Sequence, residues 1–398
     1  MLLGISQGTG QISGFLRGAD CMNTIACFRQ LGVDVEDSGT EIIVRGHSLR
    51  GLRKPESVLN VSNSGTTIRL ISGILAGQDF TSIVTGDQSI RRRPMDRIIV
   101  PLLQMGAMIE GEGGGNLAPL VIHGGDLTAI DYTLPVASAQ VKSAILLAGL
   151  YADGQTIVRE QFPSRNHTEL MLEFLGAEIS WADGVITIAS SELMAREIQV
   201  PGDLSSAAFF LATAAAIPGS HLLIENVGLN PTRTGIIDVL RAMGALIELE
   251  NLRKNGGEEV GDIVVRGKRL HGTNIGRGII PRLVDEIPIL TVIAGVAEGT
   301  TKITGAEELR HKESNRLTAL VTELSKLGIR VRELPDGVEI DGPNQVLGGQ
   351  VESYGDHRVA MALACAGLFA QNPVRIRGSE CIAVSFPGFH RTLKNIVI

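Results

Sequence analysis

The chain has 398 residues, more than a single hydrophobic core usually supports, and this length predicts about two domains. Hydrophobic residues make up 44% of it and charged residues 20%, a composition that is typical of folded globular proteins and excludes a disordered chain. The formal net charge of −7 argues against nucleic acid or an anionic membrane as a partner.

The chain opens on the short apolar stretch MLLGISQGTGQI (1–12), which has no basic leader and does not read as a secretory signal. This stretch is similar to LLAGLYADGQTI (146–157), the tail of a longer apolar helix and the strand after it. We therefore expect the chain to open midway through a repeated unit, without the polar start of that unit's apolar helix.

The next element is an amphipathic helix that ends in Leu-Gly within FRQLGVDV (28–35). Glycine is typical of a helix C-terminus, because a left-handed backbone costs little without a Cβ. We call helices of this type glycine-capped helices. The pattern recurs in LLQMGAMI (102–109), LEFLGAEI (172–179), LRAMGALI (240–247) and LSKLGIRV (324–331), and in part in SFPGFHRTL (385–393). The later members are expected to begin near Arg93, Ser164, Thr232, Glu313 and Ser385.

A second helix type is almost wholly apolar after a polar start, which predicts buried helices. We call these apolar helices, and they cover residues 63–77, 138–154, 203–219, 285–299 and 356–370. Short alternating segments predict strands at EIIVRG (41–46), LVIHG (120–124), VITIAS (185–190), DIVVRG (262–267) and VEIDG (338–342).

These elements recur at a spacing of roughly 70–85 residues, which gives six units of an α/β fold. We expect two compact domains of three units each, residues 1–201 and 202–398, with the boundary at the Pro-Gly of QVPG (199–202). A solenoid is the alternative, but solenoid repeats usually have about 20–50 residues.

Cations gather at several helix starts, where the helix dipole itself favours anions. Bound phosphate or carboxylate groups explain this best, since arginine binds both in a bidentate manner. A solvated arginine is the alternative for any one of them, whereas Arg93, Arg316 and Arg358 together favour a ligand. The cations in question are Arg91, Arg92, Arg93, Arg97, Arg165, Arg310, Lys312, Arg316 and Arg358, and Arg69 lies inside an apolar helix.

Two carboxylates, Asp285 and Glu313, stand at the starts of consecutive helices and could share a face. The neighbouring Lys312 and Arg316 should keep Glu313 ionised and able to accept a proton. An i,i+3 salt bridge between Glu313 and Arg316 is an equally good interpretation. In the same way the acidic and amide residues Asn63, Asp203, Asp285 and Asp356 could be ordinary N-caps.

Other motifs do not meet their requirements. The four cysteines show no CxxC spacing and the eight histidines no HExxH pattern, so neither a disulfide framework nor a metal site is expected. GEGGGN (111–116) lacks the last glycine of a dinucleotide fingerprint, and GDIVVRGKR (261–269) lacks the Ser or Thr of a phosphate loop. No apolar run reaches the roughly 18 residues of a membrane span, so we expect a cytoplasmic protein.

Six longer motifs carry a specific resemblance, which extends over nearly the whole chain. The chain resembles the enolpyruvyl transferases, in particular those that act on shikimate 3-phosphate. The motifs are SNSGTTIRL (62–70), RRPMDRI (92–98), ASAQVKSAILLAGL (137–150), VDEIP (284–288), HKESNRL (311–317) and YGDHRVAMA (354–362). The resemblance implies an inside-out α/β fold of two domains with the active site in the cleft between them. Each domain has three βαβαββ units, the first here lacking its N-terminal part.

The implied reaction moves the carboxyvinyl group of phosphoenolpyruvate to the 5-hydroxyl of shikimate 3-phosphate and releases phosphate, as a step of aromatic amino acid synthesis. It uses no metal and no organic cofactor. The resemblance also implies a monomer, and an enzyme inhibited by glyphosate, since Gly65 and Thr66 match the sensitive pattern.

Residue by residue, the resemblance assigns phosphoenolpyruvate binding to Gly65, Arg93, Gln140, Arg316 and Arg358. It assigns shikimate 3-phosphate binding to Ser138, Gln140, Arg165, Asp285 and Lys312, and proton transfer to Asp285 and Glu313, with His357 supporting Glu313.

The sequence departs from the family at three places. Ala139 replaces a serine of some members, and Val384 stands where some members have a lysine. The family's Lys-Ser-x-Ser-x-Arg motif belongs to the segment expected to be missing, so the chain as written should turn over weakly. Two alternatives follow: a UDP-N-acetylglucosamine enolpyruvyl transferase, and a paralogue that binds substrates with little turnover. The first usually carries a cysteine where this chain reads DQSIRRRP (87–94) and a leucine at His357.

Overall fold

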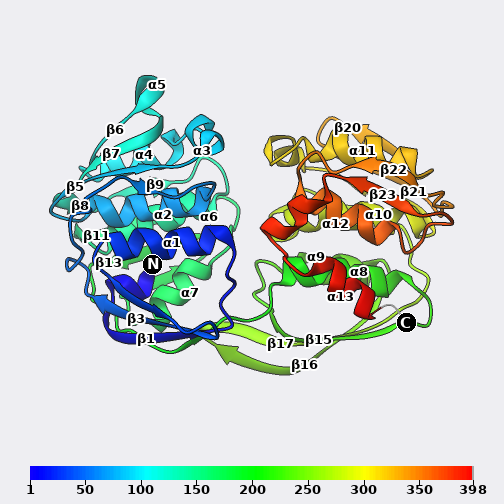
Figure 1. Cartoon of the computed structure of the whole chain (residues 1–398), viewed down its shortest axis with the longest axis horizontal. Coiled ribbons are helices and arrows are strands. Elements are labelled where there is room, and N and C mark those ends of the chain that lie inside the picture. Colours follow the sequence, from blue (N-terminus) through cyan, green and yellow to red (C-terminus); the bar gives the residue numbers. More distant parts are fainter. Residues whose placement is uncertain (397–398) are drawn as a thin grey trace. The chain divides into compact units, whose positions relative to one another are not determined.

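A computed structural model describes residues 1–396 and shows an α/β chain of mixed sheets (Figure 1). The chain divides into two compact units. The first comprises residues 1–200 together with residues 255–258, and the second comprises residues 201–254 and those from 259 onward. Each unit has its own hydrophobic core.

The first unit contains three four-stranded sheets of the same design. In each, one parallel pair is followed by two antiparallel pairs, as in the order β4-β5-β7-β6. The elements of this unit are η1 (Leu2–Ile5), β1 (Gln7–Ser13), α1 (Ala19–Gln30), β2 (Asp34–Asp37), β3 (Glu41–His47), β4 (Leu59–Asn60), α2 (Gly65–Ala76), β5 (Thr81–Thr85), α3 (Gln88–Arg92), α4 (Asp96–Gln104), β6 (Met108–Gly111), α5 (Glu112–Gly115), β7 (Leu117–His123), β8 (Leu127–Thr128), β9 (Asp131–Thr133), α6 (Ala139–Gly149), β10 (Ala152–Asp153), β11 (Gln155–Arg159), α7 (His167–Phe174), β12 (Ile179–Ala182), β13 (Val185–Ala189) and β14 (Ile198–Gln199).

The second unit repeats this design in the sheet β18-β19-β21-β20 and adds the sheets β15-β17-β16 and β22-β23. Its elements are α8 (Leu204–Ala216), β15 (His221–Gly228), α9 (Gly235–Ala242), β16 (Leu246–Asn255), β17 (Glu258–Arg266), β18 (Asn274–Ile275), η2 (Ile280–Arg282), η3 (Val284–Glu286), α10 (Ile287–Val296), β19 (Gly299–Ile303), η4 (Glu307–His311), α11 (Arg316–Lys326), β20 (Arg330–Leu334), β21 (Gly337–Gly342), β22 (Gly349–Glu352), α12 (His357–Ala366), β23 (Val374–Arg377), η5 (Ser379–Val384) and α13 (Phe389–Ile396).

The apolar helices are the crossovers that join the parallel strand pairs, as α2 joins β4 to β5 and α10 joins β18 to β19. They lie against one another inside each unit, α2 against α6 and α8, α10 and α12 together, while sheets and glycine-capped helices lie outside them (Figure 1). At Gly73 of α2 a Cβ atom would stand only 2.2 Å from the carbonyl oxygen of Ala144 in α6, so this close approach requires glycine. The repeated α/β fold predicted from the sequence is confirmed.

The glycine-capped helices end as predicted. Gly32, Gly106, Gly176, Gly244 and Gly328 all have φ between 86° and 97°. The expected starts, however, were placed too early, because α4, α7, α9, α11 and α13 begin three or four residues after Arg93, Ser164, Thr232, Glu313 and Ser385. The residues in between form turns, bends and irregular backbone, and at α11 the side chain of Asn315 provides the N-cap.

Four of the five apolar helices have a side chain as N-cap. Asp203 and Asp356 cap α8 and α12 as the sequence allowed, whereas Ser64 and not Asn63 caps α2. Ser138 caps α6. Asp285 is not the N-cap of α10, which is Glu286, because η3 precedes α10 and includes Asp285 in its 3-10 turn.

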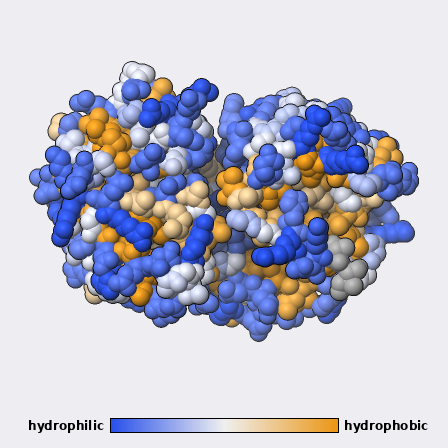
Figure 2. All heavy atoms as spheres, viewed as in Figure 1, coloured by the Kyte–Doolittle hydropathy of each residue, from blue (hydrophilic) through white to orange (hydrophobic). Residues whose placement is uncertain are grey.

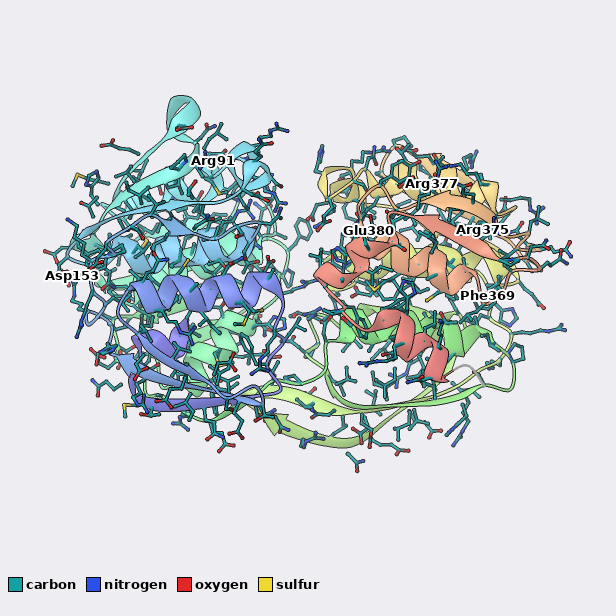
Figure 3. All side chains as sticks on the ribbon, viewed as in Figure 1. Arg91, Asp153, Phe369, Arg375, Arg377 and Glu380 are labelled. Atoms are coloured by element: carbon teal, nitrogen blue, oxygen red, sulfur yellow. The ribbon has the colours of Figure 1, made fainter. Side chains whose placement is uncertain are left out.

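The surface of each unit mixes polar and apolar side chains. Figure 2 shows hydrophobic residues interspersed with hydrophilic ones on the visible face of both units. On β23, Arg375 and Arg377 are exposed, while Val374 and Ile376 are half-buried and pack on the second core (Figure 3). Within residues 1–396, no helix combines the length and apolarity that crossing a membrane requires.

Candidate active site

The first unit places two guanidinium groups at the start of α2. Gly65 is the first residue of the helix, and a Cβ atom there would stand 3.1 Å from Nη1 of Arg93 and 3.2 Å from Nη1 of Arg69. Burial lowers the pKa of Arg69, and the nearby charges of Arg93 and Arg97 lower it further. Three arginines and a helix N-terminus thus concentrate positive potential at one place, which suits an anionic ligand.

Gln140 connects this cluster to α6. Its Oε1 accepts a hydrogen bond from Nη1 of Arg69 at 2.5 Å, and its Nε2 donates to Oγ1 of Thr66 at 2.8 Å. Ser138, two residues earlier, accepts from the backbone N–H of Val141 and so begins α6. The structure therefore brings together Gly65, Arg93 and Gln140, three of the residues to which the resemblance assigns phosphoenolpyruvate binding.

Arg93 follows the short helix α3 and is held by neighbours on two sides. Its Nη2 donates to Oγ of Ser89 at 3.1 Å and to Oδ1 of Asn63 at 3.5 Å. Asn63 in turn donates to the carboxylate of Asp87 at 2.8 Å, and Asp87 caps α3. Asn63 thus helps to orient Arg93. The sequence suggested only that Asn63 could be an N-cap.

Arg165 lies, partly buried, in the segment between β11 and α7. The residue before it, Ser164, is buried and donates from both its N–H and its Oγ to the carboxylate of Glu160. The carboxylate of Glu160 also forms an ion pair with Nζ of Lys142 on α6. The same Nζ forms a second ion pair with Glu169 on α7. Sequence analysis missed this buried cluster, although a lone lysine in an otherwise apolar helix was its signal.

In the second unit three carboxylates meet at Arg316, whose side chain is only 1% exposed. Its Nε donates to Asp356 at 2.7 Å, Nη2 to Glu313 at 2.5 Å and Nη1 to Asp285 at 3.4 Å. Burial alone would lower the pKa of Arg316, but Asp356, Glu313 and Asp285 together raise it above its usual value. The predicted salt bridge from Glu313 to Arg316 is therefore present, and so is the convergence of Asp285 and Glu313.

Arg358 and His357 form the first turn of α12 beside this group. Nε of Arg358 lies 3.7 Å from Oδ1 of Asp285. The pKa of His357 is lowered by burial and by the charge of Arg358, although Glu313 and Asp356 oppose the shift. The lowered pKa favours the neutral imidazole, which can donate one hydrogen bond and accept another.

Lys312 stands apart from the Arg316 group in its contacts. Its Nζ lies 2.5 Å from Oε1 of Glu308, four residues earlier on η4, and its side chain is partly exposed. The structure thus brings Asp285, Glu313, Arg316, His357 and Arg358 together, while the contact seen for Lys312 is the one with Glu308.

A second network that sequence analysis missed supports Asp285. The buried carboxyl group of its neighbour Glu286 accepts a hydrogen bond from Oγ of Ser205. Arg233 donates to the same Ser205 oxygen at 2.6 Å and to Asp203 at 2.7 Å. Burial, and then the charge of Asp285, raise the pKa of Glu286. The network joins the start of α8 to η3, which carries Asp285.

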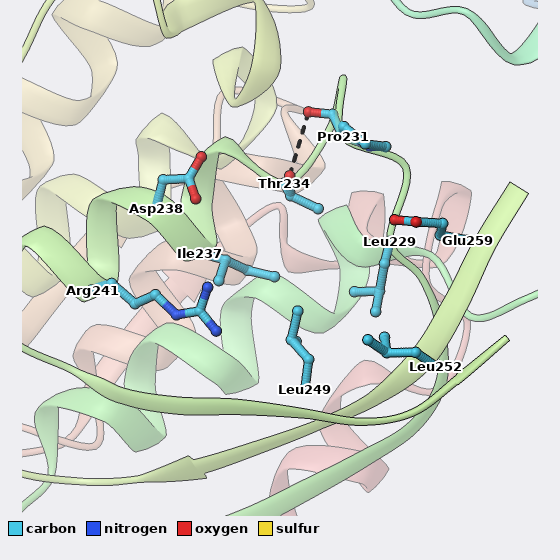
Figure 4. A pocket seen from close by; sticks show the side chains of 9 residues that line it. All are labelled: Leu229, Pro231, Thr234, Ile237, Asp238, Arg241, Leu249, Leu252 and Glu259. Atoms are coloured by element: carbon cyan, nitrogen blue, oxygen red, sulfur yellow. Dashed lines mark hydrogen bonds between the residues drawn. The ribbon is translucent and has the colours of Figure 1, made fainter.

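A cavity of about 150 Å³ in the second unit lies between α9 and the strands β16 and β17 (Figure 4). Apolar residues such as Leu229, Ile237 and Leu249 line it, with Asp238 and Arg241 on one side. None of the site residues predicted from the sequence lines this cavity. Within residues 1–396, no group of three or more His, Cys, Asp or Glu side chains is arranged to hold a metal ion.

Comparison with known proteins gives one consistent result. The family model described as EPSP synthase (3-phosphoshikimate 1-carboxyvinyltransferase) matches residues 1–393. The 3-phosphoshikimate 1-carboxyvinyltransferase of Alkaliphilus metalliredigens (strain QYMF) is 65% identical over 397 residues, covering 100% of this chain and 93% of that protein. The protein of the same description from Bacillus anthracis is 51% identical over 393 residues, covering 98% and 92%.

A solved structure of EPSP synthase from Acinetobacter baumannii has a TM-score of 0.93 and 43% sequence identity. It matches over 100% of this chain and 92% of that chain. The agreement of motifs, fold and whole-chain similarity shows that the chain belongs to the EPSP synthase family.

Proposed function

We infer that the chain transfers the enolpyruvyl group of phosphoenolpyruvate to the 5-hydroxyl of shikimate 3-phosphate and releases phosphate. The observation that carries this inference is the 65% identity, over the full length of the chain, to a 3-phosphoshikimate 1-carboxyvinyltransferase. The two clusters of charged side chains, one in each unit, agree with a reaction between two anionic substrates.

We assign the binding of phosphoenolpyruvate to Gly65, Arg93 and Gln140 of the first unit and to Arg316 and Arg358 of the second. In the first unit, the support is the N–H groups at the start of α2 beside two guanidinium groups. In the second unit, Nε of Arg358 lies 3.7 Å from Oδ1 of Asp285, and the planar fork of its guanidinium group suits a phosphate or carboxylate group.

We assign the binding of shikimate 3-phosphate to Ser138, Gln140, Arg165, Asp285 and Lys312. Ser138 and Gln140 stand at the amino end of α6, where backbone N–H groups and the helix dipole favour a phosphate. Arg165, in the segment before α7, supplies a bidentate donor for the same group.

Proton transfer falls to Asp285 and Glu313. In the addition step Asp285 accepts the proton of the 5-hydroxyl while the oxygen bonds to C2 of phosphoenolpyruvate, and Glu313 gives a proton to C3, which becomes a methyl group. In the elimination step the methyl group returns a proton to Glu313, the double bond re-forms as the bond from C2 to the phosphate oxygen breaks, and the departing phosphate takes the proton held by Asp285. The neutral His357 keeps Glu313 oriented, and Arg316 fixes both carboxylates.

The test is a phosphate-release assay with phosphoenolpyruvate and either of two acceptors. Turnover with shikimate 3-phosphate but not with UDP-N-acetylglucosamine is expected, and the reverse preference would overturn the assignment. Calorimetry that shows binding of shikimate 3-phosphate by a chain without turnover would support the paralogue alternative instead.

Three finer assignments complete the proposal. Glyphosate should inhibit, because it offers phosphonate and carboxylate groups to the cluster at Gly65 and Arg93. The protein should act as a monomer, since each unit has its own core. A cytoplasmic location suits the four free cysteines at Cys21, Cys27, Cys365 and Cys381, which a reducing compartment keeps unpaired.

A further inference from the structure

The buried cluster of Lys142, Glu160 and Ser164 lies behind the predicted acceptor-binding residues of the first unit. We propose that these three residues are positioning residues, which hold Arg165 against the start of α6 and thereby set the affinity for the phosphorylated acceptor. This inference rests on the proposed function, because that function assigns the acceptor to Ser138, Gln140 and Arg165.

The contacts run in an unbroken line from α6 to the segment that carries Arg165. Nζ of Lys142 lies 2.9 Å from Oε2 of Glu160. The other oxygen of that carboxylate, Oε1, accepts from the backbone N–H of Ser164 at 3.3 Å and from its Oγ. The next residue in the chain is Arg165.

Both ends of this line are close to the predicted ligand contacts. Lys142 stands two residues after Gln140 and four after Ser138 on the same helix, so it shares a helix face with Ser138. Beyond Arg165, Oγ of Ser143 on α6 lies 2.6 Å from Oγ1 of Thr168 on α7. The segment from 160 to 166 contains no helix or strand, and these bonds to α6 contribute to its conformation together with the backbone bond from Glu160 N–H to the carbonyl of Gly184.

Burial makes the arrangement rigid. The side chains of Lys142, Glu160 and Glu169 are 1%, 5% and 2% exposed. A buried ion pair contributes little net stability, but losing one partner leaves an uncompensated charge, so alternative positions of the segment are strongly disfavoured. A loop that must present a guanidinium group to a phosphate gains from such fixation, because preorganisation reduces the entropy lost on binding.

Glu169 provides a matched control within the same cluster. Its Oε1 contacts Nζ of Lys142 at 2.6 Å, but it does so from α7 and not from the 160–166 segment. Its other oxygen, Oε2, is buried without a hydrogen-bond partner. Glu169→Gln therefore removes a buried charge from Lys142 and leaves the bonds between Glu160 and Ser164 in place.

The experiment measures the affinity of the full chain for shikimate 3-phosphate by calorimetry, with circular dichroism to confirm folding. Glu160→Ala should raise Kd by about tenfold or more, because a displaced Arg165 would lose one charge-assisted contact with the ligand. Ser164→Ala, which keeps every ion pair, should raise it by roughly threefold to tenfold. Glu160→Gln should recover part of the affinity, since its side-chain oxygen still accepts from Ser164, and Glu169→Gln should stay within about twofold of wild type.

In the active enzyme the same variants should raise KM for shikimate 3-phosphate more than KM for phosphoenolpyruvate. Equal affinity in wild type and a folded Glu160→Ala protein would overturn the inference, as would an equal loss in Glu169→Gln. If Glu160→Ala fails to fold, the affinity of Ser164→Ala is the test, and an unchanged Kd in that variant would overturn the inference. A wild-type chain that binds no shikimate 3-phosphate would overturn the proposed function itself, and the inference with it.

Discussion

Arg316 shows how one buried side chain can organise several functional groups. It begins α11, yet its guanidinium group contacts Asp356 at the start of α12 and Asp285 in η3. Its five N–H donors form a rigid fork, which lysine cannot reproduce. The positions of the predicted proton-transfer carboxylates therefore depend on this one residue.

Replacing Arg316 by methionine is expected to destabilise the protein by about 3–5 kcal/mol, because Asp356 would remain buried without its cation. Arg316→Lys keeps the charge but loses the fork, and we expect kcat/KM to fall by about two orders of magnitude with a smaller loss of stability. Urea unfolding and steady-state kinetics measure the two effects. Arg332→Met, at an arginine whose side chain is 70% exposed, is the control and should change neither.

Gly65→Ala should weaken inhibition by glyphosate. The added Cβ would stand 3.1 Å from Nη1 of Arg93 and 3.2 Å from Nη1 of Arg69, so it would occupy space at the site proposed for the phosphonate group. The inhibition constant should rise by about tenfold or more, with a smaller rise in KM for phosphoenolpyruvate. Gly125→Ala, where a Cβ meets nothing within 4 Å, is the control. Unchanged inhibition of the Gly65 variant would contradict this placement.

At the scale of elements, the architecture depends on how closely the apolar helices pack. At the contact of α2 with α6, no side chain separates the two helix backbones at Gly73. Gly73 lets α2 approach the backbone of α6 directly, and Ser64 and Ser138 cap the two helices. These capped ends are the same ends that carry Gly65 and Gln140. Packing and binding are therefore linked through the helices themselves.

Gly73→Ala should destabilise the first unit by about 1–3 kcal/mol, because the new methyl group would overlap the carbonyl oxygen of Ala144 and the helices must separate. Denaturant unfolding followed by circular dichroism measures the change. Gly125→Ala again serves as the control, and a Gly73 variant as stable as wild type would show that the helices can move apart freely.

The pKa of Glu169, at the contact of α6 and α7, predicts how the stability of the protein changes with pH. Burial raises the pKa of Glu169 above 4.5 in spite of Lys142. The folded state therefore binds this proton more tightly than the unfolded state, and the stability from this group is lost as pH rises from 4.5 through the raised pKa. Melting temperatures of Glu169→Gln should exceed those of wild type by more at pH 8 than at pH 5. A difference that does not grow with pH would contradict the shift.

At the scale of the whole molecule, each unit has its own core. We therefore expect thermal unfolding that does not fit a single two-state transition. The calorimetric enthalpy should exceed the van't Hoff enthalpy, since the units are able to unfold separately. Shikimate 3-phosphate should raise the transition that Gly73→Ala lowers, because Ser138, Gln140 and Arg165, three of the five residues assigned to this ligand, lie in the first unit. A single transition with equal enthalpies would contradict this expectation.

The sequence predicted what depends on neighbours along the chain. Repeated Leu-Gly or Met-Gly endings located the helix C-termini, since each depends on one local backbone conformation. Helix starts were placed too early, and Asp285 was allowed as an N-cap, because turns before a helix leave little trace in the periodicity. The cluster of Lys142 with Glu160 and Glu169 was missed for a different reason. Its partners lie on other elements, 18 and 27 positions later, and only the fold brings them to α6.

The pairing of β14 with β1 has a consequence for how the chain folds as it is synthesised. Ile12 and Ser13 pair with Ile198 and Gln199, and Asn255 then donates to the carbonyl of Gln199 at 2.7 Å. On the ribosome, the first strand must therefore wait for nearly two hundred further residues before its parallel neighbour emerges. Contacts of such long sequence separation fold slowly. During that wait the edge of β1 opposite β3 is open, and a chaperone that shields nascent strands should act on this protein before β14 emerges.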